Sequence, residues 1–419
     1  MEKRIVLAAV VVLIVIGIVY LYSKPDQQPN GAQQTALAVG GQNGSLPASS
    51  CKFPADPPSP TAGLAAFDDY GWKMFVAMNW PVEAGQRGVP DCSKPIGSST
   101  DVVWTSYKFS EEIFLKGAAD PGPWNSPAGN MPMRLVGISK VFPIVAKQIQ
   151  STITQPVGGW LIDQKGNPTY YQIAVDETSY NYVRSNKFYN LDVVQGATKV
   201  DFPDMSLEIK ASWRHLTKDD DADRYFTRPA LFQLYDSSGK PVGQPEAGTA
   251  GLVGLHIIVK AKGYPQWIWA TFEQVDNVTA TGPVPASYND PNCTGPYCSP
   301  PNQSPLISGQ PFDSPNQVTR LTSLYPEAIA ANTKYQSALK GTPFQYYHLV
   351  TTQYPTDPDD PGNPLGTPTP NVAANTTMES YIQDTSSCMA CHSTARVPGG
   401  TQAKTDFSFI LLHAQPPAN

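Results

Sequence analysis

The chain has 419 residues, and 41% of them are hydrophobic, enough to build one large core or two ordinary ones. The 32 glycines and 42 prolines favour many short strands joined by turns over a helical bundle. The formal net charge of −6 argues against a nucleic-acid partner, because binding to phosphates requires a basic face.

The N-terminus carries an unbroken apolar run, Ile5–Tyr22, directly after two basic residues. Its 18 residues are long enough to cross a hydrocarbon core of about 30 Å. We therefore expect residues 1–22 to be a transmembrane signal anchor and residues 23–50, rich in Gln, Gly, Ala and Ser, to be a flexible linker. This predicts a protein of the bacterial inner membrane with its globular part in the periplasm. A cleaved signal peptide is the alternative, with Ala-Leu-Ala at residues 36–38 as the cleavage site.

Residues 51–375 are expected to form a β-rich globular domain. A helix is predicted over Leu64–Met78, where apolar side chains recur at helical spacing. Beyond it the apolar period changes to two, as in strands. The predicted strands are a hairpin over Gly158–Val175 and single strands over Leu207–Trp213, Ala230–Tyr235, Leu252–Lys260 and Trp267–Phe272. The expected fold class is mainly β (α+β), one large β-sheet domain with few helices.

Two stretches rich in proline, Thr281–Pro315 and Tyr354–Pro370, are predicted to be long surface loops. A short helix over Thr376–Gln383 is then expected to lead into the last motif of the chain.

That motif is Cys388-Met389-Ala390-Cys391-His392, a CxxCH sequence. Each cysteine thiolate of such a motif can add across one vinyl group of a haem, and the histidine can ligate the iron. Residues 376–419 are therefore expected to form a segment that binds one covalent haem c. A redox CxxC pair or half of a zinc site is the alternative, but the sequence has no second CxxC to complete a zinc set.

The six cysteines suit an oxidising compartment, because four remain outside the motif. Nearness in the sequence favours two disulfides, Cys293 with Cys298 and Cys51 with Cys92, while the spacing alone leaves the other pairings open.

The sixth iron ligand has to come from upstream of the motif or from the tail, because no methionine follows His392. Our first choice is His256, since Gly254, two positions away on the same face of its strand, leaves room for a macrocycle. The alternative is a histidine at the edge of the core that is satisfied by a hydrogen bond. The other candidates are His215, His348 and His413. A filled sixth site favours electron transfer, and an open one permits chemistry on small ligands.

Three groups of residues carry a resemblance to a known family. They are Gly71–Trp80; Leu255–Ile257 with Trp267–Glu273; and Ser387–His392 followed by Asp406–Phe409. From about residue 60 onwards the chain resembles a poorly characterised family of exported bacterial single-haem c-type cytochrome proteins. The resemblance implies haem binding by Cys388, Cys391 and His392, and it implies no substrate. A weaker likeness is to the cytochrome c prime-beta group, β-rich proteins whose CxxCH is also near the C-terminus and whose five-coordinate haem meets small molecules; the present chain is far longer.

The favoured interpretation is therefore an electron carrier that exchanges single electrons with a redox partner protein or a membrane electron donor. The alternative is a haem-dependent oxidoreductase, of the peroxidase or oxygenase type, with an open iron site. A haem-based sensor or a structural subunit of a respiratory assembly is a third interpretation.

Overall fold

The structure is a computed structural model that describes residues 46–126, 133–137 and 159–418, which belong to one compact unit. The predicted anchor, and the predicted linker as far as residue 45, lie outside the described residues. Within the described ranges, no helix is long and apolar enough to cross a membrane.

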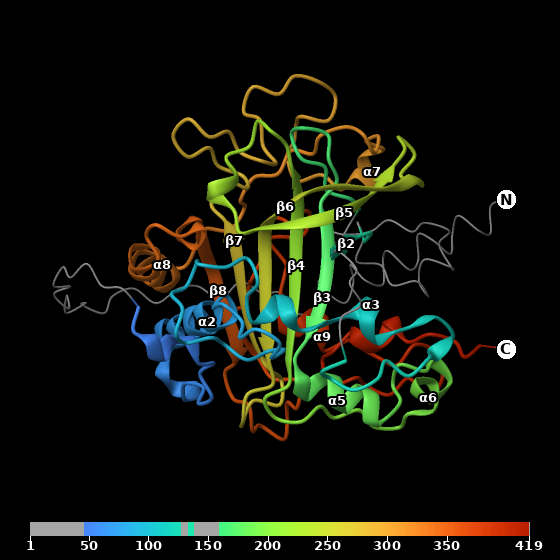
Figure 1. The fold of residues 1–419 in the computed structure, drawn as a ribbon. Helices are drawn as coiled ribbons and strands as arrows, with labels where there is room; N and C mark the ends of the chain where they lie inside the picture. Colours follow the sequence, from blue (N-terminus) through green and yellow to red (C-terminus); the bar gives the residue numbers. More distant parts are fainter. Residues whose placement is uncertain (1–45, 127–132, 138–158, 419) are drawn as a thin grey trace. The chain divides into compact units, whose positions relative to one another are not determined.

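A nine-stranded sheet forms the centre of this unit, with the strand order β1-β3-β4-β6-β7-β8-β9 and with β5 paired to β6 and β2 to β5 (Figure 1). All pairs are antiparallel except β2 with β5. This large antiparallel sheet with few helices is consistent with the mainly β fold that the sequence predicts. The strands are β1 (Lys108–Phe109), β2 (Met133–Leu135), β3 (Tyr170–Val175), β4 (Leu207–Leu216), β5 (Thr227–Tyr235), β6 (Pro241–Val259), β7 (Ile268–Gln274), β8 (Tyr347–Pro355) and β9 (Pro368–Thr369).

The helices are short, apart from two that pack against each other, α2 and α8. The α-helices are α2 (Leu64–Met78), α3 (Ser110–Ile113), α5 (Glu177–Ser185), α6 (Leu191–Gly196), α7 (Pro305–Ser308), α8 (Pro326–Ala338) and α9 (Cys388–His392). The 3₁₀ turns are η1 (Ala48–Cys51), η2 (Pro60–Ala62), η3 (Trp104–Ser106), η4 (Lys116–Ala118), η5 (Ala222–Arg224), η6 (Pro343–Tyr346) and η7 (Ile410–His413).

One face of the sheet is apolar and packs on α2, which lies beside α8 (Figure 1). Phe272 of β7 meets the rings of Trp72 and Phe75 from α2, with centroids 5.0 and 4.4 Å away. Trp72 in turn stacks on Tyr335 of α8 at 5.1 Å. The predicted helix over Leu64–Met78 is confirmed, and its bulky side chains fill this side of the core because they recur at helical spacing.

The opposite face of the sheet is polar and yet buried. Residues directly across an antiparallel pair point to the same face, so the register assigns its members. They include Glu208, Lys210 and Ser212 of β4, Gly254 and His256 of β6, Trp269, Thr271 and Glu273 of β7, and Thr351 and Gln353 of β8. Buried polar groups cost free energy unless they are hydrogen-bonded. Much of their bonding comes from the C-terminal segment, beginning at Asn375.

The predicted hairpin is right in part, and one further sequence prediction is wrong. The chain reverses at the predicted turn, where Asp163 and Thr169 donate their backbone N–H groups to the carbonyls of Asn167 and Leu161, and the second half of the hairpin is β3. Residues 159–162 form isolated bridges instead of a strand, and Asn316 exchanges hydrogen bonds with Ile162. The stretch Thr376–Gln383 is a run of turns instead of a helix. Its hydroxyl and amide side chains bond to nearby backbone or to the sheet, which competes with helical hydrogen bonds.

The other four predicted strands are confirmed as β4, β5, β6 and β7. Strand β6 begins eleven residues earlier than predicted, and the other bounds differ by at most three residues. The two proline-rich stretches are mostly loops, with α7 in the first and with the end of β8 and all of β9 in the second.

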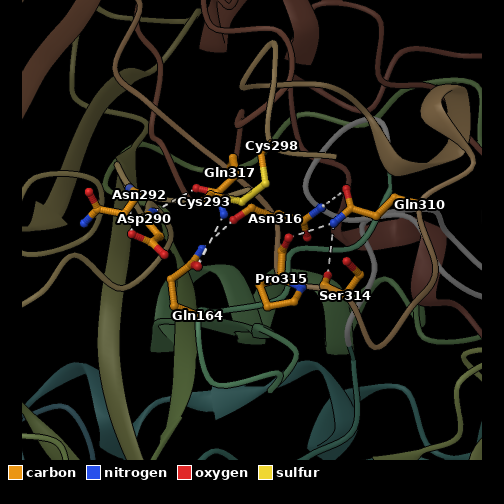
Figure 2. The surroundings of a disulfide bond; sticks show 10 residues. All are labelled: Gln164, Asp290, Asn292, Cys293, Cys298, Gln310, Ser314, Pro315, Asn316 and Gln317. Atoms are coloured by element: carbon orange, nitrogen blue, oxygen red, sulfur yellow. Dashed lines mark hydrogen bonds between the residues drawn. A yellow bond between two sulfur atoms is a disulfide. The ribbon is translucent and has the colours of Figure 1, made fainter. Parts of the chain in front are cut away.

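Both predicted disulfides are present, Cys51–Cys92 and Cys293–Cys298, with Cα atoms 5.6 and 5.7 Å apart. The second closes a tight surface loop held by a set of amide side chains (Figure 2). Gln317 accepts from the backbone N–H of Asp290 at 2.8 Å and donates to Gln164 at 3.3 Å. Amide side chains therefore connect this loop to the turn before β3.

A buried carboxyl group, Asp68 of α2, makes the stability of the fold depend on pH. One oxygen accepts the backbone N–H of Thr352 at 2.7 Å, and the other has no hydrogen-bond partner among the described residues. Burial raises the pKa of Asp68 from 3.8 to about 7, and Glu327 adds to the rise, against the opposing hydrogen bond. Between these two values the folded chain holds a proton that the unfolded chain has released, so the free energy of unfolding falls as pH rises.

We expect Asp68→Asn to remove this dependence. Relative to the native chain, the variant should gain stability on the order of 3 kcal/mol between pH 4 and pH 7, measured by urea unfolding. Asp69→Asn on the same helix is the control, because ion pairs lower the pKa of Asp69 and the sign of its pH dependence is opposite. Parallel pH profiles for Asp68→Asn and the native chain would contradict the assignment.

Candidate functional site

The CxxCH motif forms α9, a single helical turn bound to the polar face of the sheet. Ser387 caps this helix by accepting the backbone N–H of Ala390 at 3.2 Å. Gln353, buried on β8, accepts the backbone N–H of Met389 at 2.9 Å and the hydroxyl of Ser387 at 3.2 Å. The side chain of Met389 is buried beneath the helix. One strand residue therefore fixes the start of the motif on the sheet.

The two cysteines of the motif are three residues apart and so lie on the same side of the helix. Cys388 is half-buried and Cys391 is exposed, while Met389 between them points into the core. A helical turn with this arrangement presents both thiols to a group lying against one side of α9, at the border between the protein and solvent.

The ring of His392 lies between two aromatic side chains. Its centroid is 4.4 Å from that of Trp269 on β7 and 4.9 Å from that of Phe409. Its Nδ1 atom donates to the backbone oxygen of Phe407 at 2.7 Å, since a carbonyl can only accept. The proton is therefore on Nδ1, and Nε2 carries a lone pair that can bind a metal. Nε2 lies at the opposite edge of the ring.

An unusual backbone turn directs the carbonyl of Phe407 toward His392. Asp406 and Phe407 both have left-handed backbone angles, with φ of 54° and 64°, which side chains other than glycine adopt at a cost. Asp406 accepts from Lys260, the residue directly after β6, and from the backbone N–H of Phe202, both at 2.7 Å. Ser408 donates to the buried carboxyl group of Glu208. These contacts hold the turn in place, and burial raises the pKa of Glu208 to about 7.

His256, the predicted sixth ligand, lies on the same face of the sheet as Trp269. Trp269 lies opposite Ile258 of β6. His256 is two residues from Ile258 on the same strand, a distance of roughly 7 Å. The side chain is buried, and its Nε2 atom is 3.6 Å from a carboxylate oxygen of Glu379, which also accepts the backbone N–H of Asn375 at 2.9 Å. The structure thus pairs His256 with an acid on the face that carries the motif. The room expected beside Gly254 is filled, because a Cβ atom there would lie 2.5 Å from the hydroxyl oxygens of Ser212 and Thr377.

The other three histidines have different surroundings. His215 stacks on Phe232 at 4.1 Å, and burial lowers its pKa. His348 lies 3.7 Å from the carboxylate of Glu273. His413 packs on the ring of Phe114 at 5.8 Å, and burial of the imidazole lowers its pKa to about 4.

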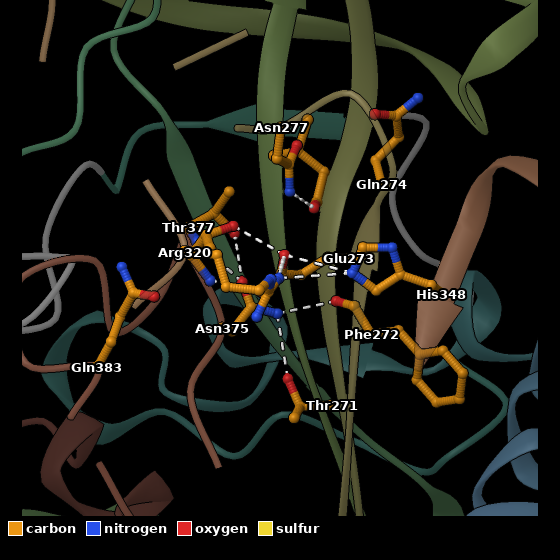
Figure 3. A network of polar contacts seen from close by, with 12 residues as sticks. Thr271, Phe272, Glu273, Gln274, Asn277, Arg320, His348, Asn375, Thr377 and Gln383 are labelled. Atoms are coloured by element: carbon orange, nitrogen blue, oxygen red, sulfur yellow. Dashed lines mark hydrogen bonds and ion pairs between the residues drawn. The ribbon is translucent and has the colours of Figure 1, made fainter. Parts of the chain in front are cut away.

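A buried polar network attaches the segment before the motif to the sheet (Figure 3). Glu273 of β7 pairs with Arg320 and accepts both the N–H and the hydroxyl of Thr376, at 2.6 and 2.8 Å. Asn375 donates to the backbone oxygen of Phe272 at 2.8 Å. Burial alone would raise the pKa of Glu273, but Arg320 and His348 outweigh burial and hold it below the usual value. This network was not predicted from the sequence, although a glutamate within an apolar strand is a signal that the carboxylate has buried partners.

The described residues hold no cluster of three or more His, Cys, Asp or Glu side chains that could bind a metal ion by themselves. Comparison of the chain with protein-family models, with curated proteins and with solved structures gives no match.

Proposed function

We propose that the chain is a membrane-anchored, periplasm-facing c-type cytochrome with one haem, and that it transfers single electrons. The observation that supports this most directly is the hydrogen bond from Nδ1 of His392 to Phe407, because it prepares Nε2 to bind iron. The CxxCH motif provides the two thiols that covalent attachment requires.

The residues around the motif fit a haem. Cys388 and Cys391 would form the two thioether bonds and His392 would be the proximal iron ligand, with Trp269 and Phe409 fixing the plane of its ring. Once bound, the haem supplies one-electron chemistry at its iron. Gln353 holds the start of α9 against the sheet, and the strained turn at Phe407 holds the ring of His392 in its orientation.

The exposure of Cys391 supports electron transfer. A group bonded to this sulfur would lie at the protein surface, where a redox partner protein or a membrane electron donor could approach it. The anchor of residues 1–22 and the linker of residues 23–50 would keep the chain at the periplasmic side of the inner membrane while allowing it to reach such partners.

The pair of His256 and Glu379 favours a second candidate function, a haem-dependent oxidoreductase of the peroxidase or oxygenase type. A buried imidazole beside a carboxylate can hold a proton and pass it on, as a general acid or base does. In the carrier, the same imidazole would be the sixth ligand and would close the iron to small molecules.

An optical spectrum separates the two functions. We expect the reduced protein to be low-spin and unchanged by carbon monoxide, and we expect His256→Ala to make it high-spin and able to bind carbon monoxide. His215→Ala is the matched control and should leave the spectrum as it is. Binding of carbon monoxide to the native chain would favour the oxidoreductase, and an unchanged spectrum in His256→Ala would exclude His256 as the ligand.

A further inference from the structure

A continuous row of rings runs from His392 to the surface of α5. Neighbouring rings in the row are in contact. The centroid distances are 4.4 Å from His392 to Trp269, 6.5 Å from Trp269 to Trp267, 5.8 Å from Trp267 to Phe202 and 4.7 Å from Phe202 to Tyr182. We call these five residues the aromatic row.

Trp267, in the middle of the aromatic row, has a conformation and an environment that cost stability. Trp267 is almost completely buried and has a left-handed backbone with φ of 64°. Its indole N–H has no hydrogen-bond partner among the residues that the structure describes. A smaller apolar side chain would avoid the buried N–H, so packing alone does not explain an indole at this position. Backbone strain of this kind concentrates at functional sites.

The aromatic row ends in a surface hollow of about 570 Å³. Tyr182 and Pro203 supply its apolar part, and Pro203 directly follows Phe202 in the chain. Its rim carries side-chain groups that can bond to hydroxyls, from Glu177, Asn181, Ser185 and Asn186. The hollow is shallow and open to solvent, and its lining combines the ring of Tyr182 with side-chain groups that can bond to hydroxyls.

We propose that this hollow binds a small hydroquinone-type reductant and that the aromatic row carries its electron to the iron held by His392. This inference rests on the proposed haem. One electron would pass by tunnelling from the bound hydroquinone to the ferric iron of a haem held by His392 and reduce it to the ferrous state. One O–H bond of the hydroquinone breaks, and its proton goes to the carboxylate of Glu177 or to water. The resulting neutral ring radical leaves, and two such radicals disproportionate to one hydroquinone and one quinone. The side chains of the aromatic row mediate the transfer and are not themselves oxidised.

Stopped-flow reduction of the ferric protein by methylhydroquinone tests the electron path. We expect the rate to saturate with hydroquinone concentration, and we expect Phe202→Leu to lower the limiting rate roughly tenfold or more. Phe202→Tyr keeps a ring at this position and should keep most of the rate. Reduction by dithionite, which can act at the exposed edge near Cys391, should be equal in all variants.

Calorimetry with resorcinol, a dihydroxybenzene that does not form a stable quinone, tests the hollow without electron transfer. Asn181→Trp should fill the hollow and abolish binding of resorcinol, whereas Val193→Trp on the exposed side of α6 should not. Rates without saturation, equal rates in Phe202→Leu and the native chain, or binding that survives Asn181→Trp would each overturn the inference. A chain that binds resorcinol but carries no haem would overturn the proposed function and leave the hollow as a binding site.

Discussion

Replacing both Cys388 and Cys391 by serine is expected to give a colourless protein from cells that attach haem to the native chain. Serine hydroxyls do not add to the vinyl groups of haem, so both covalent bonds are lost. The fold should remain, because α9 is attached to the sheet through Gln353, Met389 and the cap at Ser387 and not through the thiols. The visible spectrum and the thermal unfolding of the two purified proteins measure these outcomes.

The matched control is the pair Cys293→Ser and Cys298→Ser, which removes a surface disulfide far from the motif in sequence. This control should keep the colour of the native chain. A variant without Cys388 and Cys391 that still carried covalent haem would show that the attachment site lies elsewhere.

Replacing Glu273 by glutamine is expected to lower the free energy of unfolding by about 3 kcal/mol, the usual cost of removing one partner from a buried ion pair. The substitution leaves the guanidinium of Arg320 without its counter-charge and weakens the two hydrogen bonds from Thr376. The segment that leads into the motif should therefore open more often. Urea unfolding measures the first effect, and hydrogen exchange of the backbone amides at residues 375–379 measures the second.

The control for Glu273 is Glu246→Gln on the exposed part of β6, which should change the stability by less than about 0.5 kcal/mol. The pH dependence gives a further check. Because the pKa of Glu273 is held below 4.5, its contribution is present above that value and is lost as pH falls through the pKa of the folded state. The stability difference between Glu273→Gln and the native chain should therefore shrink in acid, and a constant difference would contradict the ion-pair account.

Much of the fold could be predicted because its local patterns are strong. The helix Leu64–Met78 and the strands β4, β6 and β7 follow from apolar periods of 3.6 and 2. The wrong elements depend on distant partners. Ile162 bonds to Asn316, and the turns after Asn375 are shaped by bonds to β7, and neither contact leaves a local signal in the sequence.

Part of the candidate site could likewise be predicted from local sequence, and part depends on contacts between distant residues. The motif gives Cys388, Cys391 and His392 directly, because their spacing has a chemical reason. The contact that orients His392 depends on a turn held by Lys260, which is 146 positions from Asp406 in the chain. Alternation along β6 and β7 separates a polar face from an apolar one, and the C-terminal segment covers the polar face and makes it part of the site.

The intact mass of the full chain, made in cells that attach haem and measured under denaturing conditions, tests the central claim most directly. We predict the mass of the polypeptide plus one haem, because thioether bonds to Cys388 and Cys391 survive unfolding. The mass of the polypeptide alone would contradict the account.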